Sequence, residues 1–212
     1  METDELWRTI HGQRSALADI LGTLSPQDWE HASLCPDWTV RDVAAHVISS
    51  AGFSTGEALV GVLRARGNFN RLMFNEAKRL SARPTDEIIA DYRRLDGSRR
   101  HPPGTTTVDP LMDVLVHTQD IVRPLGRHHE MPARPSAVAA DQVWSRSFPF
   151  RARRRLGGYR LAATDIDWAV GDGPEINGSM GALLLLLTGR AVGAPELSGD
   201  GIERLTLERN GS

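Results

Sequence analysis

Apolar residues in the first part of the chain recur at the spacing of an α-helix. In residues 5–24, Leu6, Ile10 and Leu17 stand whole turns apart, and polar residues such as Arg8 and Arg14 lie between them. The same periodicity predicts five further helices, at 39 to about 65, 69–82, a short segment from Pro84-Thr85, Leu111 to about Leu125, and 136–148. The first 150 residues are therefore predicted to be helical.

Two of these helices have recognisable start positions. Thr39 is a residue type favoured at the N-cap, and Asp42 stands three residues later, where an acidic side chain completes a capping box. Asp109 followed by Pro110 predicts a second helix start, because an acidic N-cap and a proline at the first helical position are both favoured. We therefore expect helices to begin at Thr39 and at Asp109.

The hydrophobic pattern changes after about residue 150. Short strands are predicted at Tyr159–Thr164, Ile166–Val170 and Ile202–Glu208, the last because two leucines stand two residues apart. The apolar stretch Gly181–Gly189 predicts a buried helix between them. The predicted fold is mainly α, with a helical bundle over residues 1–150 and a small α+β domain over residues 151–212.

Composition and charge limit the kinds of partner. The 25 Lys and Arg residues nearly balance the 27 Asp and Glu residues, whereas a nucleic-acid-binding domain is usually clearly basic. The longest apolar run, Ala182–Leu187, is far shorter than the roughly 20 residues that span a bilayer. The single cysteine, Cys35, excludes an intramolecular disulfide. We expect a cytoplasmic monomer or homodimer that binds a small molecule and neither nucleic acid nor membrane.

Two histidines and one aspartate are the strongest candidates for a functional site. Asp113 and His117 stand four residues apart, so their side chains share one helix face. His46 lies beside the apolar face of the helix predicted from Thr39, and is expected to point into the bundle. If these two helices pack side by side, three ligands with a vacant position describe a catalytic metal site. Two neutral imidazoles and one carboxylate would leave a divalent ion with a positive charge, which favours an anionic fourth ligand.

The same residues also have a purely structural interpretation. A histidine on an amphipathic helix is often a hydrogen-bonded core residue, and Asp113 with His117 can form a local helix pair. Cys35 is interpreted as a small buried side chain, because no histidine stands at a recognisable spacing to activate it. The neighbouring residues His128 and His129, and the basic run Arg151–Arg155, are expected to be solvated.

Three segments, in order along the chain, carry motifs. The first is Leu34-Cys35-Pro36-Asp37-Trp38-Thr39-Val40-Arg41-Asp42-Val43-Ala44-Ala45-His46-Val47. The second is Asp113-Val114-Leu115-Val116-His117-Thr118-Gln119-Asp120-Ile121. The third runs from Ile176-Asn177-Gly178-Ser179 to Leu187-Thr188-Gly189-Arg190 and is followed by Ser198-Gly199-Asp200. Together they resemble the mycothiol-dependent maleylpyruvate isomerase family of the DinB-like superfamily, in which the second motif is normally Glu-x-x-x-His followed by Asp.

The resemblance implies a DinB-like four-helix bundle and a small, sterol-carrier-like C-terminal domain. It implies that His46, Asp113 and His117 bind a divalent metal, usually zinc, with nickel and iron as alternatives. Asp113 departs from the family's glutamate and is one methylene shorter, which bears on metal affinity and identity. Asp120 follows His117 by three residues and either orients its ring or is a surface acid near Arg123.

The resemblance also implies mycothiol as a cofactor. A metal-bound thiolate would add to an electrophilic substrate, which makes the protein an isomerase or an S-transferase. Two other classes remain open at this point. One is a DinB-like hydrolase that uses metal-bound hydroxide, and the other is a non-catalytic protein that binds a small molecule or a lipid.

Overall fold

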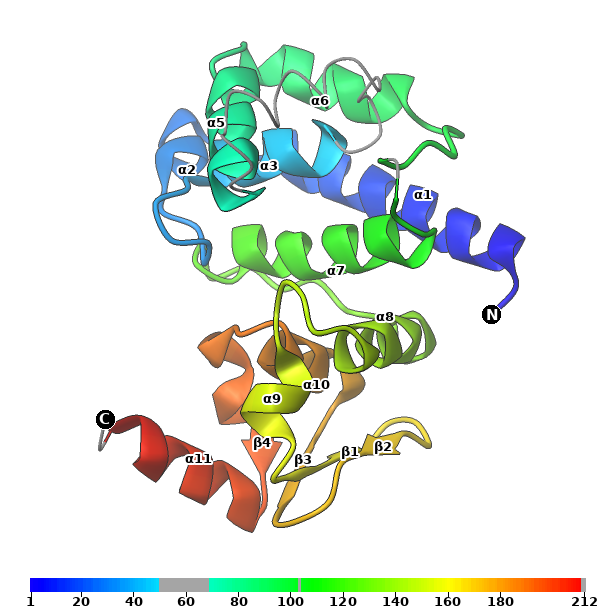
Figure 1. The fold of residues 1–212 in the computed structure, drawn as a ribbon. Helices are drawn as coiled ribbons and strands as arrows, with labels where there is room; N and C mark the ends of the chain where they lie inside the picture. Colours follow the sequence, from blue (N-terminus) through cyan, green and yellow to red (C-terminus); the bar gives the residue numbers. More distant parts are fainter. Residues whose placement is uncertain (50–68, 103, 211–212) are drawn as a thin grey trace. The chain divides into compact units, whose positions relative to one another are not determined.

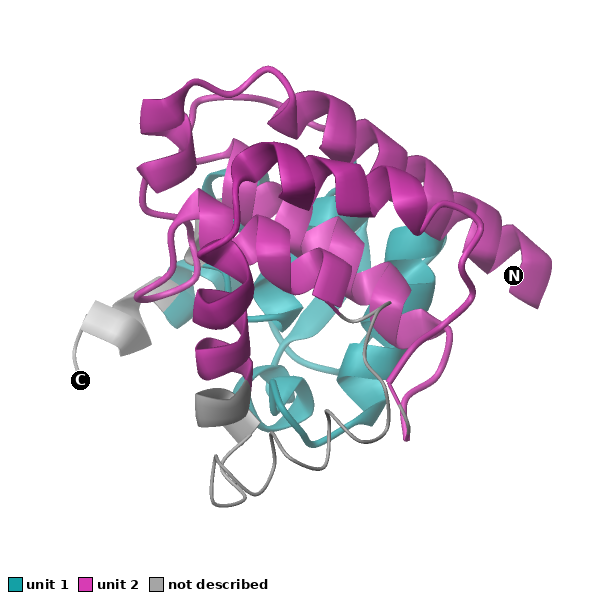
Figure 2. Cartoon of the chain, turned by 90° about the horizontal axis from the view of Figure 1, so that it is seen from above, with its two compact units in different colours: residues 1, 130–212 teal, residues 2–129 magenta. Residues whose placement is uncertain are grey.

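The computed structural model describes residues 1–49, 69–102 and 104–210 (Figure 1). Contacts between Cα atoms divide the chain into two compact units (Figure 2). One unit comprises residues 2–129, and the other comprises residues 130–212 together with Met1. Each unit is described by itself below.

The first unit is helical. Its helices are α1 (Thr3–Leu21), α2 (Pro26–Glu30), α3 (Val40–Ser49), α5 (Phe69–Ser81), α6 (Thr85–Arg94) and α7 (Val108–Val122). The helices α1, α3, α6 and α7 form a four-helix bundle, in which α1 and α3 each pack against both α6 and α7. Helix α5 packs on the outside of α3. The four-helix bundle predicted from the sequence is therefore present.

The bundle core consists of the apolar residues that recur at helical spacing. Leu17 and Leu21 of α1, Val43 of α3, and Val114 and Ile121 of α7 belong to one buried cluster. Each removes its apolar surface from water, which contributes roughly 1.5–3 kcal/mol for a fully buried aliphatic side chain. This packing holds α3 and α7 against each other, and these are the helices that carry the candidate metal ligands.

Helix α3 begins where the sequence predicts, whereas helix α7 does not begin at the predicted N-cap residue. The Thr39 N–H donates to Asp42 Oδ2 at 2.8 Å, and the Asp42 N–H donates to Thr39 Oγ1 at 3.3 Å, which is the predicted capping box. Helix α7 begins at Val108, so Asp109 is in its first turn rather than at its N-cap. The Asp109 carboxylate instead accepts hydrogen bonds from the N–H and hydroxyl of Thr106.

The other helix boundaries fall close to the predicted ones. Helix α7 ends at Val122, three residues before the predicted end. Helix α3 is described to Ser49, and the part of its predicted span that reaches residue 65 lies outside the described residues.

The second unit combines a small sheet with helices. Its elements are α8 (Ala133–Ser145), α9 (Ala152–Leu156), β1 (Arg160–Ala163), β2 (Ala169–Val170), β3 (Glu175–Gly178), α10 (Met180–Leu187), the 3₁₀ helix η1 (Ala191–Glu196), β4 (Leu197–Ser198) and α11 (Asp200–Asn210). The strand order is β2-β1-β3-β4, with β1 and β3 parallel and the outer pairs antiparallel. The small α+β unit expected at the C-terminus is therefore found.

Helix α10 lies at the centre of this unit. All of its residues are buried, and it packs against α8, η1 and the strands β1 and β3. Because α8 packs on α10, the division between the compact units falls before α8, earlier than the boundary predicted near residue 150. None of the described helices is both long and apolar enough to cross a lipid bilayer.

The strand predicted at Ile202–Glu208 is wrong, because residues 200–210 form helix α11. Gly199 has a φ of +100° and turns the chain out of β4 into this helix. Gly201 in its first turn lies against β3, where a Cβ atom would stand 2.8 Å from the carbonyl oxygen of Glu175. The actual third strand, β3, was not predicted, since two of its four positions are occupied by the polar residues Glu175 and Asn177.

Candidate metal centre

Helices α3 and α7 bring the three candidate ligands together. Asp113 Oδ1 lies 3.5 Å from His46 Nε2 and 3.4 Å from His117 Nε2. The two imidazole rings stand nearly perpendicular, with their centroids 5.0 Å apart. One donor atom from each of the three residues lies within 4.8 Å of the others. The juxtaposition expected from the sequence is therefore present, and metal binding by these residues stays a prediction.

The arrangement fits a divalent ion. Donor atoms bound to one tetrahedral ion at 2.0–2.1 Å lie about 3.3 Å from each other, close to the two distances measured here. Asp113 Oδ2 is buried and has no hydrogen-bond partner among the described residues, which is unusual for a carboxylate oxygen. The donors are two imidazole nitrogens and one carboxylate, a set that zinc accepts.

The electrostatics of the cluster favour a positive charge at its centre. Burial would raise the pKa of Asp113, but the charge of His46 and a hydrogen bond from His117 outweigh it and hold that pKa well below its usual range. Burial would likewise lower the pKa of His117, but hydrogen bonds to Asp113 and Asp120 raise it well above its usual value. Metal ions and protons compete for such groups, so metal binding here would release a proton.

Asp120 sets the orientation of the His117 ring. His117 Nδ1 lies 2.8 Å from Asp120 Oδ2, and Asp120 is fully buried. Because Nδ1 donates this hydrogen bond, the lone pair of the neutral imidazole is on Nε2, which faces Asp113 and His46. Of the two interpretations left open by the sequence, the structure supports the orienting residue rather than the surface acid.

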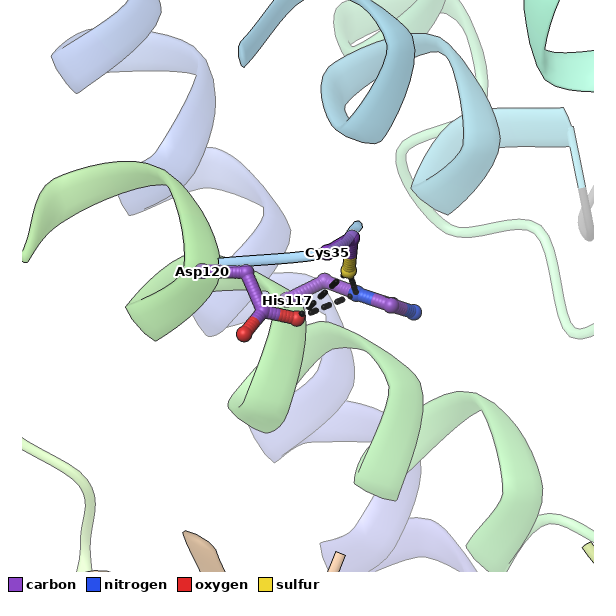
Figure 3. Close-up of side chains that lie close together, drawn as sticks. All are labelled: Cys35, His117 and Asp120. Atoms are coloured by element: carbon purple, nitrogen blue, oxygen red, sulfur yellow. Dashed lines mark hydrogen bonds and ion pairs between the residues drawn. The ribbon is translucent and has the colours of Figure 1, made fainter. Parts of the chain in front are cut away.

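Cys35 is the residue whose environment the sequence did not reveal (Figure 3). Its thiol donates to Asp120 Oδ2 at 3.2 Å, and its Sγ lies 3.7 Å from His117 Nδ1. No sequence spacing indicated this histidine, and it lies near Cys35 because the loop folds back onto α7, where the Leu34 N–H donates to the Asp120 carbonyl. Cys35, His117 and Asp120 form a second group of potential donors, which shares His117 with the first.

Trp38 packs directly against the candidate ligands. Its ring meets His46 edge-on with centroids 5.0 Å apart, and it stacks on His117 at 6.5 Å. Trp38 also contacts the buried core of the bundle. It therefore fixes both imidazoles as well as the loop that precedes α3.

Two groups expected to be solvated make structural contacts instead. His129 Nε2 lies 2.8 Å from Gln13 Oε1 of α1, whereas His128 is exposed as expected. Arg155 of the basic run donates to the carbonyl oxygens of Leu186 and Leu187, which satisfies the C-terminal end of α10. Neither group contributes to the cluster around Asp113.

Comparison with known proteins shows what the helical part of the chain is similar to. A family model described as the mycothiol maleylpyruvate isomerase N-terminal domain matches residues 10–100. The resemblance inferred from the motifs is thus confirmed. The matched residues include His46, whereas Asp113 and His117 follow them in the sequence.

Two solved structures have the same fold as the whole chain. One is a crystal structure of the mycothiol-dependent maleylpyruvate isomerase, with a TM-score of 0.64 and 16% identity over 94% of this chain and 93% of that chain. The other is a histidine-to-alanine mutant of that enzyme, with the same TM-score and 15% identity over the same shares. A search of curated proteins finds no match. The predicted fold, a helical bundle followed by a small α+β unit, is confirmed.

Proposed function

We propose that this protein is a metal- and mycothiol-dependent enzyme of the maleylpyruvate isomerase type, in which the thiol adds to an electrophilic carbon of a small substrate. The observation that carries the proposal is the convergence of His46, Asp113 and His117 on one point in a chain of this family. The proposed location is the cytoplasm, where low-molecular-weight thiols are kept reduced.

His46, Asp113 and His117 would hold the ion, and zinc is the proposed metal. A divalent ion with an open position supplies Lewis acidity, which lowers the pKa of a thiol ligand from its usual value of about 8.5. Within the protein, Asp120 accepts the proton of His117 Nδ1, and Trp38 packs against both imidazoles. These contacts keep both Nε2 atoms directed at Asp113.

The short side chain of Asp113 is compatible with this role. Its Oδ1 already lies within 3.5 Å of both imidazole nitrogens, so the helices approach closely enough for an aspartate to reach. The residue therefore does not argue against the metal site.

Asp120→Asn is expected to weaken zinc binding about 10–100-fold, which is typical for the loss of a charged group that orients a histidine ligand. Asparagine keeps an acceptor for His117 Nδ1 but removes the negative charge that increases the basicity of Nε2. The measurement is the zinc dissociation constant in competition with a chromophoric chelator. Asp86→Asn, which changes an exposed acid on α6, is the matched control. Unchanged zinc affinity in Asp120→Asn would contradict the orienting role.

Ligand-dependent thermal unfolding tests the proposed function. Mycothiol should raise the melting temperature of the zinc-loaded protein, and the rise should disappear after chelation of the metal and in His117→Ala. Glutathione and a fatty acid are the comparison ligands. A rise with the fatty acid and none with mycothiol would favour the lipid-binding alternative. A metal-dependent ester or amide hydrolysis without any thiol response would favour the hydrolase.

Counting thiols distinguishes the two reaction classes. With a substrate that has a conjugated double bond, an isomerase releases the thiol again, so the free thiol concentration stays constant. An S-transferase keeps the thiol in its product, so one thiol is consumed for each substrate converted. The assay therefore needs only a colorimetric thiol reagent and the metal-loaded protein.

A further inference from the structure

Helix α1 carries a group of buried polar atoms that have no hydrogen-bond partner. Among the described residues, these atoms are His11 Nδ1 and two nitrogens of Arg14, Nε and Nη1. On the neighbouring helix α7, Asp113 Oδ2 is in the same condition. More than about 90% of buried polar groups in native proteins are hydrogen-bonded, so several such atoms close together need an explanation.

These atoms belong to one region of the bundle interior. His11 and Arg14 stand one turn apart on α1, and α1 packs against α7, which carries Asp113. The charge of Arg14 acts on His11, and the charge of Asp113 acts on Arg14. Tyr92 of α6 also interacts electrostatically with Arg14, but its hydroxyl donates to the carbonyl oxygen of Ala44 at 2.7 Å.

Arg14 is the unusual member of the group. It is 3% exposed, although the helical pattern of the sequence places it among the polar positions of α1. In the described part of the chain no carboxylate lies within 4.0 Å of its guanidinium, and the His11–Asp96 pair at 3.9 Å is too long for a hydrogen bond. A guanidinium has five N–H donors, and burying it without an acceptor is strongly unfavourable.

The carboxylate of Asp113 does not supply the hydrogen-bond acceptor that the Arg14 guanidinium lacks. Its Oδ1 faces His46 and His117, and those two histidines compensate its negative charge. Arg14 thus remains a buried cation beside the candidate metal centre, with unused donors and no anion of the described chain in contact. An external anion of small size would satisfy it.

We propose that Arg14 and His11 form an anion subsite for a small carboxylate, next to Asp113. A guanidinium fork matches the two oxygens of a carboxylate, and the neighbouring imidazole supplies a further hydrogen-bonding nitrogen. The subsite rests on the unpaired atoms of α1 and not on the proposed thiol chemistry. It would place a negatively charged group of a ligand beside the metal centre, on the α1 side.

Thermal unfolding in sodium acetate, compared with sodium chloride at equal ionic strength, tests the subsite. At about 100 mM acetate, a dissociation constant of about 10 mM would raise the melting temperature of the wild-type protein by about 3–6 °C. Arg14→Met should abolish the rise. Arg8→Met, which removes an exposed arginine of the same helix, should keep it. If Arg14→Met does not fold, Arg14→Gln replaces it in this test, because glutamine keeps N–H donors and removes the charge.

Repeating the acetate experiment without the metal distinguishes a subsite on α1 from binding of acetate to the metal. The acetate effect should persist in protein dialysed against a chelator and in His117→Ala, because the subsite is made by α1. An effect that vanishes in both would mean that acetate binds the metal, and the subsite would be wrong even if the metal site is right. No acetate effect in the wild type, or an equal effect in Arg14→Met, would also overturn the proposal.

Discussion

Replacing His46 or His117 by alanine is expected to remove the divalent metal from the purified protein. Among the residues that the structure describes, each imidazole is one of the three potential donors of this cluster, together with the carboxylate of Asp113. Loss of a direct ligand should weaken binding by more than about 100-fold, the upper end of the effect of changing a residue that only orients a ligand. The metal content per chain, measured by elemental analysis, should fall from about one to near zero, and thiol-dependent activity should fall with it.

Three further variants sharpen this test. Asp113→Asn should lose the metal, because it removes the only charged ligand. Asp113→Glu should retain it, because it restores the residue that the family normally has. His128→Ala, which removes an exposed histidine, should leave the metal content unchanged. Equal metal content in the wild type, His46→Ala and His117→Ala would reject the proposed site.

The juxtaposition of the three candidate ligands could be predicted because local rules determine most of their positions. The spacing of Asp113 and His117 places both on one face of any helix, and the capping box from Thr39 to Asp42 fixes where α3 begins. The position of His46 on the inner face then follows from the apolar periodicity. Only the side-by-side packing of α3 and α7 required the structure.

The environment of Cys35 could not be predicted in this way. Cys35 lies in a loop, and its contacts with His117 and Asp120 join residues more than 80 positions apart in the sequence. Such contacts depend on how the loop folds over α7, which no local pattern specifies. The burial of Arg14 could not be predicted either, because a rule based on the hydrophobic pattern assigns polar residues to the solvent-exposed face of a helix. Exceptions to such rules are expected at functional sites.

In the C-terminal unit, the sequence pattern did not correctly predict the helix α11 and the strand β3. Two alternating leucines suggested a strand at residues 202–208, but Asp200 and Glu203 are acids in the first turn of α11, where the helix dipole favours them. The strand β3 has only four residues, and its pairing with β1 and β4 stabilises it. Pairing partners are not visible in a local window of sequence.

The second large effect is expected at Asp42, whose replacement by alanine should destabilise the helical unit by about 3–5 kcal/mol. The carboxylate is buried and accepts hydrogen bonds from Ser81 Oγ at 2.6 Å and Lys78 Nζ at 2.6 Å, as well as from the N-cap residue Thr39. Removing it leaves the buried hydroxyl of Ser81 and the half-exposed ammonium of Lys78 without their carboxylate, and each hydrogen bond to a charged group contributes about 1.5–3 kcal/mol. The loss also uncouples α5 from α3, one turn before His46.

Chemical denaturation measures this effect, and pH identifies its origin. Burial would raise the pKa of Asp42, but hydrogen bonds from Lys78, Ser81 and Thr39 outweigh it and lower that pKa. A carboxylate with a lowered pKa stabilises the fold fully above its unfolded pKa of about 3.9, and this contribution is lost as the pH falls toward the folded pKa. The difference between wild type and Asp42→Ala should therefore be largest near neutral pH and shrink below about pH 4.

Matched variants separate the ion pair from the hydrogen bonds. Lys78→Met should cost less than Asp42→Ala, because the lysine side chain is 41% exposed and Asp42 keeps its bonds to Ser81 and Thr39. Asp19→Ala, at an exposed position of α1, should change stability by no more than about 0.5 kcal/mol. If Asp42→Ala were as stable as Asp19→Ala at pH 7, the contacts of Asp42 would not hold α5 on α3, and the position of His46 would depend on the packing of α3 against α6 and α7.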